Sequence, residues 1–471
     1  MERVNRSEGS SDHYPIIDRT ISRHETPPTS MDGLWIATII FIVTYALISI
    51  RRFPKVKVDR PAAALLGAGL MIVFGVVGPS EAIASINLDI ILLLVGMMIL
   101  VAGLELCGFF EWVSLRMIKY SKDQFTFLVL TMVVTGTLSA LVLNDTVVLL
   151  FTPIIIRTCR LLKSNPVPFL IAEAIAANIG SVATAVGNPQ NAYIATKAGI
   201  SFLDFSVKLA PVAAVCMLVA IAMMYIICRK DIRKGNAHEF RQKILKDGWN
   251  AFEEEIVNGD AFARSGMKKL KEHRTGLFAL LGITGVTFIA FMSSHVIGVP
   301  LAVIAFLAGV AALFILPLVS DLRSKDMLAG VDWSIILFFV GLFVVLQGVK
   351  DSGLLFEIRR FFPGFEEGAL PKAEWLTALS ALLSNLVSNV PSVMLLSELI
   401  PLSETDLWFA LASSSTLAGN ATILGAAANV IVAEKAEGMG VELSFWKFTL
   451  VGFPIAMATL FVSTIMLMIL F

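Results

Sequence analysis

A single carboxylate interrupts a long uncharged stretch in the first third of the chain. From Thr126 to Ile156 every residue is uncharged except Asp145, which stands between Asn144 and Thr146. A carboxylate near the middle of a bilayer costs on the order of 3 kcal/mol, and such groups usually face a cavity on an ion or proton route. Asp145 could therefore bind Na+ or exchange a proton. The structural alternative is a carboxylate tied to backbone donors at a turn.

A second uncharged run carries an asparagine without an acid. The stretch "NLVSNVPSVMLL" contains Ser388 and Asn389, followed by Val390 where the first run has Asp145. An asparagine amide offers an oxygen that can accept a cation and N–H groups that can donate to an anion. We expect both uncharged runs to contribute to one binding site.

Two glycine-asparagine pairs should interrupt helices in the apolar segments. Gly187-Asn188 lies in "VGNPQN" and Gly419-Asn420 lies in "AGNATILGAAAN". Proline cannot donate to the helical ladder, and glycine tolerates the dihedral angles of a break. Paired breaks near the midplane hold substrates and ions in transporters built from inverted repeats. The predicted substrate and ion site comprises Asn144, Asp145, Thr146, Gly187, Asn188, Asn191, Ser388, Asn389, Gly419, Asn420 and Thr422.

Composition requires that these elements lie in a membrane. The chain has 471 residues, of which 56% are hydrophobic, and a mean hydropathy of +0.80. It carries more apolar surface than one soluble core could bury, and apolar runs of spanning length recur throughout. A net charge of zero gives no basic face for nucleic acid, and CxxC and HExxH metal motifs are absent from the sequence. We expect no cofactor other than Na+ or H+ as coupling ion.

Basic residues indicate how the chain is oriented in the bilayer. Residues 51–60 and 229–274 are rich in Lys and Arg, which collect on the cytoplasmic side. This places the polar tail 1–32, which we expect to be disordered, outside the cell. Basic residues both precede and follow the Asp145 run, so its two ends should face the cytoplasm. The run is therefore predicted to be a re-entrant hairpin.

The two halves of the chain resemble each other. Gly96, Gly103 and Gly108 have the spacing of Gly341, Gly348 and Gly353, a displacement of 245 residues that also takes Asn144 to Asn389. We predict an all-α polytopic membrane protein with an inverted repeat of about ten crossing segments, two re-entrant hairpins and two broken helices. The predicted units are a first repeat over 33–228 (hairpin 125–160, broken helix 168–199), a charged cytoplasmic linker over 229–274, and a second repeat over 275–471 (hairpin 374–403, broken helix 405–437).

Four other carboxylates lie near the ends of apolar segments. An ionised group at the membrane interface costs little, so these residues are expected to have no special role. They are Glu105, Glu173, Glu398 and Glu434.

The series "NDTVVLLFTP", "VGNPQN", "SNVPSVMLL" and "GNATILGAAANVIVAEKAEG" resembles the ion transporter superfamily of citrate and dicarboxylate carriers, arsenite permeases and sodium/proton antiporters. The last motif is most similar to the arsenite-permease and antiporter branch. The resemblance implies a permease of the inner or plasma membrane, a homodimer formed through a scaffold region, and elevator-like alternating access. It also implies a Na+ site at Asn144, Gly187 and Asn188, to which Asp145 could contribute, and a second site at Asn389, Gly419 and Asn420.

We expect an ion-coupled secondary transporter for a small anion rather than an enzyme. One alternative is a Na+/H+ antiporter in which Asp145 is the exchanging group, and another is an arsenite efflux permease. A distant alternative is an intramembrane hydrolase. A channel fits paired helix breaks less well than alternating access does.

Overall fold

The computed structural model describes residues 31–49, 59–121, 123–232, 261–361 and 373–470, and the described residues are helical with no strand. Eight of the described helices are long and apolar enough to cross a membrane. The predicted polar tail lies outside the described residues except for its last two positions, and so does most of the predicted linker.

The order of elements in the first half is repeated in the second half. The first half contains α1 (Met31–Ser49), α2 (Arg60–Val73), α3 (Pro79–Ala84), α4 (Leu88–Leu106), α5 (Phe109–Tyr120), α6 (Gln124–Leu141), α7 (Asn144–Leu161), α8 (Val167–Ser181), α9 (Pro189–Ala198) and α10 (Phe202–Ile232). After α13 (Ala261–Glu272), the second half contains α14 (Arg274–Ile297), α15 (Leu301–Val319), α16 (Ser324–Ala329), α17 (Trp333–Asp351), α18 (Leu354–Phe361), α19 (Ala373–Val387), α20 (Asn389–Leu396), α21 (Thr405–Ala418), α22 (Ala427–Gly438) and α23 (Phe445–Leu470).

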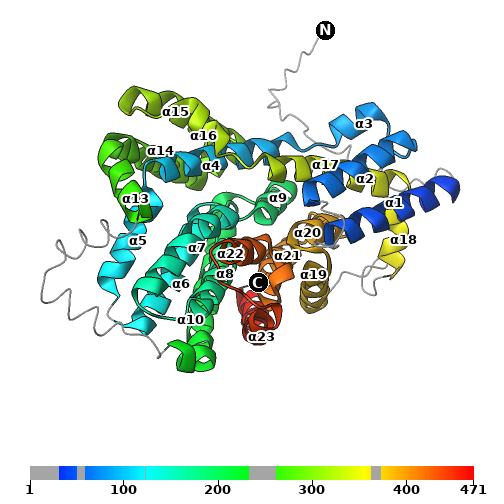
Figure 1. Ribbon diagram of the computed structural model, residues 1–471. Coiled ribbons are helices and arrows are strands. Elements are labelled where there is room, and N and C mark those ends of the chain that lie inside the picture. Colours follow the sequence, from blue (N-terminus) through cyan, green and yellow to red (C-terminus); the bar gives the residue numbers. More distant parts are fainter. Residues whose placement is uncertain (1–30, 50–58, 122, 233–260, 362–372, 471) are drawn as a thin grey trace, which may run out of the picture.

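The helices form two layers (Figure 1). The upper layer consists of α1 to α4 and α14 to α17, and the lower layer consists of α6 to α10 and α19 to α23. The short helices α5 and α18 connect the layers at opposite ends of the molecule. Each layer therefore contains helices from both halves of the chain, as the predicted repeat requires.

Glycine allows the helices of the upper layer to approach each other closely. A Cβ atom on Gly96 of α4 would lie 2.1 Å from the Ala305 carbonyl oxygen of α15, and a Cβ on Gly341 of α17 would lie 2.6 Å from the Ala64 carbonyl carbon of α2. The repeated glycines therefore mark equivalent crossings, in which each repeat packs against the other.

A second pair of repeated glycines ends equivalent helices. Gly108 follows α4 with a φ of +76°, and Gly353 follows α17 with a φ of +77°. Side chains rarely adopt this left-handed conformation, which explains why glycine stands at both positions.

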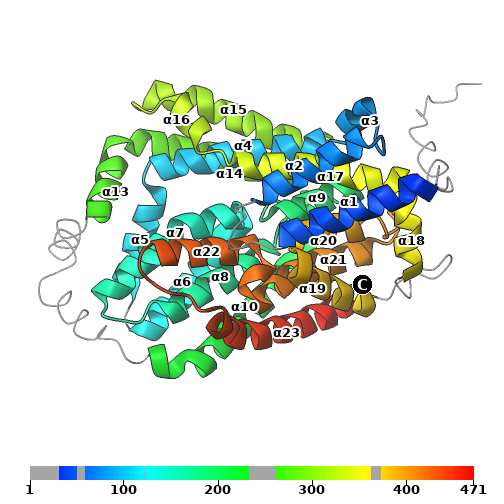
Figure 2. The ribbon, with the colours of Figure 1, turned by 45° about the vertical axis from the view of Figure 1, so that its right-hand side comes forward.

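Two helical hairpins enter the lower layer from opposite ends (Figure 2). Helices α6 and α7 come from the end where α5 and α13 lie, and α19 and α20 come from the end where α18 lies. Broken helices stand beside them: α8 and α9 are separated by residues 182–188, and α21 and α22 by the short 3-10 turns η1 (Gly419–Ala421) and η2 (Ile423–Gly425). The predicted architecture of inverted repeat, re-entrant hairpins and broken helices is confirmed.

Candidate substrate and ion site

The tip of the first hairpin is bonded to the first helix break. Helix α6 ends at Leu141 and α7 begins at Asn144. The backbone N–H of Asn144 donates to the carbonyl oxygen of Gly187 at 2.9 Å. Its side-chain oxygen accepts from the N–H of Asp145 at 2.9 Å, which satisfies one donor of the first turn of α7. The two predicted positions Asn144 and Gly187 are therefore in direct contact.

The tip of the second hairpin reaches the second break through a side chain. With its amide in the orientation that gives both its oxygen and its nitrogen suitable partners, Asn389 donates to the carbonyl oxygens of Ser415 at 3.0 Å and Gly425 at 2.8 Å. The preceding Ser388 has a φ of 82° and a ψ of 158°, a region that is strained for any residue other than glycine. Contacts around Asn389 hold this strained turn in place.

One asparagine braces each break in the same way. The Asn191 side-chain nitrogen donates to the carbonyl oxygens of Ser181 at 2.9 Å and Thr184 at 3.2 Å. The Asn429 nitrogen donates to those of Gly419 at 2.7 Å and Thr422 at 2.9 Å. Carbonyl groups freed by the break thus find an internal donor, as buried backbone requires.

This equivalence changes which residues of the two breaks correspond to each other. Since Asn191 corresponds to Asn429, Gly187 corresponds to Gly425 and Asn188 to Ala426. The predicted partners Gly419 and Asn420 lie earlier in the second break, where they correspond to Ser181 and Val182.

A polar residue that the sequence analysis did not select joins the two breaks. The Asn178 amide nitrogen donates to the side-chain oxygens of Asn420 and Asn429, both at 2.9 Å. The Asn178 oxygen accepts from the Asn144 amide at 3.3 Å. A single amide side chain inside a run of small apolar residues could have indicated this role. Such side chains also occur as ordinary packing contacts between membrane helices.

The start of α9 faces α21 of the other repeat. The Asn188 nitrogen donates to Ser181 Oγ at 2.9 Å and Thr416 Oγ1 at 3.4 Å, while its oxygen accepts from the N–H of Asn191 at 2.8 Å. Gln190 also donates to Thr416 Oγ1, at 3.3 Å. Asn188 is therefore fully engaged as a helix cap and as a contact between repeats.

A cavity of about 170 Å³ lies where the two hairpin tips meet the upper layer. Both hairpins, both broken helices and helices α2 and α17 line it. The lining residues are Arg60, Pro61, Asn144, Asp145, Pro189, Gln190, Ser334, Ile335, Phe338, Phe339, Ser388, Asn389, Val390, Ala426 and Ala427.

Arg60 places a permanent positive charge in this cavity. In the sequence Arg60 ends the basic segment 51–60, but in the structure it is the first residue of α2 and faces the site. It interacts electrostatically with Asp145 and Glu434. Its Nε atom is buried without a hydrogen-bond partner among the described residues. The cavity is thus lined by one cationic side chain, Arg60, and one acidic side chain, Asp145. Val390 stands at the position of the second repeat that corresponds to Asp145.

Comparison with known proteins assigns the chain to a family. The profile of the citrate transporter family matches residues 45–404. The chain belongs to the citrate transporter family. This confirms the predicted kinship with the ion transporter superfamily and makes the protein a multi-pass membrane transporter.

Relatives of this citrate transporter family member extend over nearly the whole chain. It is 31% identical to an uncharacterized transporter of Mycobacterium tuberculosis, over 92% of this chain and 97% of the relative. It is 30% identical to a silicon efflux transporter of rice, over 93% and 97%, and 28% identical to the human P protein, over 89% and 58%.

The predicted site residues of this transporter divide into two groups. Asn144, Asp145, Ser388 and Asn389 line the cavity. The others lie off it: Gly187, Asn188, Asn191, Gly419 and Asn420 are buried behind the tips, and Thr146 and Thr422 are partly buried beside them. The buried group supports the hairpin tips, and Thr422 does so by donating to the Asn385 side-chain oxygen at 3.2 Å.

Two of the carboxylates expected to have no special role make specific contacts inside the protein. Glu173 is completely buried between α7 and α8, where Thr152 Oγ1 lies 3.2 and 3.1 Å from its two oxygens. Glu398 forms ion pairs with two lysines. Packing between helices decides both cases, since the position of a residue along its own segment does not reveal what covers it.

Proposed function

We propose that this secondary transporter moves a small anion, with a cation or proton as coupling ion. The observation that carries this proposal is the convergence of helix starts on one cavity. Six of the described helices contribute residues from their first turn or N-cap to its lining, namely α2, α7, α9, α17, α20 and α22. A helix start has N–H groups without a partner inside the helix and a partial positive charge, which together favour an anion. At α17 the Asp332 carboxylate already accepts from two of these groups.

Arg60 strengthens this preference. A guanidinium group can donate two parallel hydrogen bonds to a carboxylate or an oxyanion. Because its Nε is without a protein partner among the described residues, a bound anion can satisfy it. The Asn144 amide offers a further donor, since Asn178 accepts only one of its two N–H groups, and Phe338 and Phe339 provide an apolar wall. A carboxylate such as citrate, or an inorganic oxyanion, matches this lining.

Oxygen atoms beneath the tips support Na+ as the coupling ion. Ser139 and Ser384 stand five residues before Asn144 and Asn389, and both hydroxyls are completely buried without a partner among the described residues. Hydroxyl and freed carbonyl oxygens are the groups that hold Na+ at helix breaks. We therefore assign a cation site to each hairpin base, with the predicted Asn144, Gly187 and Asn188 around the first.

Asp145 gives the first site a feature that the second lacks. It lines the cavity, so it can bind a coupling cation or carry a proton as access alternates. Proton exchange by Asp145 without any transported anion is the second candidate function.

The orientation and the assembly that we propose are those expected from the basic segments and from the family resemblance. We propose a location in the cell membrane, with the N-terminus outside, residues 229–274 in the cytoplasm, and a homodimer formed through the upper layer.

Purified protein in proteoliposomes tests the function. Labelled citrate, phosphate, silicic acid and arsenite are offered under imposed Na+ or pH gradients. Uptake of one charged anion that follows either gradient is the expected result. Transport of arsenite or silicic acid alone, which are neutral at pH 7, would contradict the anion assignment. Na+/H+ exchange in vesicles without any of these solutes would instead favour the second candidate.

A further inference from the structure

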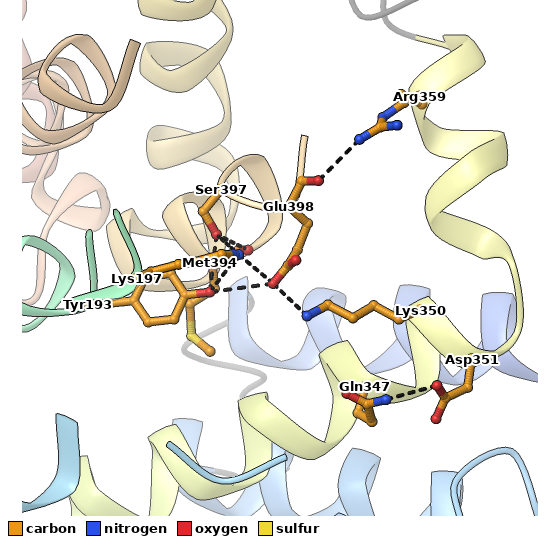
Figure 3. Close-up of polar contacts among 9 residues, drawn as sticks. All are labelled: Tyr193, Lys197, Gln347, Lys350, Asp351, Arg359, Met394, Ser397 and Glu398. Carbon is orange, nitrogen blue, oxygen red and sulfur yellow. Dashed lines mark hydrogen bonds and ion pairs between the residues drawn. The ribbon is translucent and has the colours of Figure 1, made fainter. Parts of the chain in front are cut away.

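Glu398 lies between two lysines that belong to different layers of the protein. Its Oε1 atom is 2.6 Å from Lys197 Nζ and 2.9 Å from Lys350 Nζ (Figure 3). Lys197 is on α9 of the lower layer, and Glu398 follows α20 of the same layer, whereas Lys350 is on α17 of the upper layer. The carboxylate is only 13% exposed, so solvent screens these pairs less than it screens surface ion pairs.

Two further polar contacts join the second hairpin to the upper side. The Tyr45 hydroxyl of α1 donates to the Pro391 carbonyl oxygen at 3.2 Å. The Arg359 guanidinium of α18 donates to the Glu398 carbonyl oxygen at 3.5 Å (Figure 3). The second hairpin is therefore held to α1, α17 and α18 together.

The Lys350–Glu398 ion pair lies at the end of α17 that is remote from the cavity. Ser334 at the start of α17 lines the cavity, and Lys350 is one residue from its end. At about 1.5 Å per residue the two positions are about 24 Å apart along the helix. The ion pairs thus close the protein at the side opposite the helix starts that form the site.

The inverted repeat places the counterparts of these two lysines at the other side. The displacement that relates Asn191 to Asn429 takes Lys197 to Lys435 of α22, and the displacement that relates Gly96 to Gly341 takes Glu105 of α4 to Lys350. Glu105 and Lys435 have opposite charges and interact electrostatically, but no ion pair joins them, both being among the described residues. Lys197 and Lys350 are therefore joined through Glu398, whereas their counterparts Lys435 and Glu105 are not joined although their charges attract.

We infer that Lys350 and Glu398 are positioning residues that hold the outer side closed in this state, and that Glu105 and Lys435 form an ion pair at the inner side when the outer side opens. Moving the lower layer against the upper one must break Lys350–Glu398, because its members lie on different layers. It leaves Lys197–Glu398 intact, because both of those residues move together. Formation of Glu105–Lys435 would offset the loss, so that neither state is strongly favoured. The inference rests on alternating access and not on the proposed substrate.

Accessibility of the cavity from each face of the membrane tests this. A Val390→Cys reporter lines the cavity, and the four native cysteines are buried. The probe is a membrane-impermeant thiol reagent, applied to right-side-out and inside-out vesicles. We expect Lys350→Gln to raise labelling from the outer face about five- to tenfold, and Lys350→Arg to leave it near the level of the parent. Adding Glu105→Gln to Lys350→Gln should reverse most of the rise.

Lys268→Gln is the matched control, because Lys268 forms an exposed ion pair with Glu272 within one helix. Outer labelling that does not change in Lys350→Gln, or that rises equally in Lys268→Gln, would overturn the inference. A monodisperse elution profile identifies variants that fold. Because labelling requires neither a substrate nor an ion gradient, a wrong anion assignment would leave this result unaffected.

Discussion

The side-chain amide of Asn178 donates to the side-chain oxygen of Asn420 at 2.9 Å, although the two residues belong to opposite halves of the chain. Asn178 lies on α8, the helix before the first break, and Asn420 lies within the second break. This bond joins α8, the helix that precedes the first break, directly to the second break.

Asn178→Ala should destabilise the protein. It removes the donor from Asn420 and Asn429 and leaves two buried amide oxygens short of a partner, at a cost of about 3 kcal/mol. We expect the thermal unfolding midpoint in detergent to fall by roughly 5 °C. Asn165→Ala should change the unfolding midpoint little, because Asn165 lies in an exposed loop where water can replace its hydrogen bond. Equal effects of the two substitutions would contradict this role for Asn178.

Arg60→Gln should reduce anion uptake mainly through binding. Loss of the charge-assisted hydrogen bonds should raise the KM for the transported anion about tenfold or more. Arg60→Lys keeps the charge but loses the planar pair of donors, so its KM should lie between those of the parent and the Gln variant. Initial rates in proteoliposomes give these values. Arg323→Gln removes an arginine that is 77% exposed and should have no effect. An unchanged KM in Arg60→Gln would exclude a direct contact with the anion.

Asp145→Asn should separate transport from its driving gradient. The amide keeps the size of the side chain but can neither carry a proton nor hold a cation by charge, so uptake should lose its response to a Na+ or pH gradient. Counterflow of the labelled anion without a gradient should persist. Asp204→Asn is the control, since Asp204 is exposed at the start of α10. A gradient response that persists in Asp145→Asn would assign the coupling to another group.

Ser139→Ala distinguishes a cation ligand from an ordinary buried hydroxyl. If Ser139 Oγ binds Na+, the Na+ concentration that gives half-maximal uptake should rise about tenfold, the effect of losing roughly 1.4 kcal/mol of binding free energy. Ser463→Ala is a close match, because Ser463 is also buried without a hydroxyl partner among the described residues but lies on α23. Both variants can be compared by Na+ titration of uptake. An identical Na+ dependence in the two would remove Ser139 from the proposed site.

The repeat and its hairpins could be predicted because the bilayer limits where polar and flexible residues can stand. Asn144 and Asn389 are conspicuous in uncharged runs. Gly96 and Gly341 begin two glycine series of equal spacing, and both lie at close helix crossings. These signals are local. They therefore indicated both hairpin tips and both helix breaks before any contact was known.

Contacts between segments could not be predicted in this way. Arg60 has the sequence context of a charged loop, and Glu398 that of an interfacial carboxylate, yet one faces the cavity and the other joins two layers. Asn178 gained its role only because α8 packs against the second break. Register between helices depends on how side chains of distant segments fit together, and no spacing within one segment records it. The repeat, its breaks and its polar tips can be read from the residue types along single segments, whereas the packing of distant helices sets which charges meet.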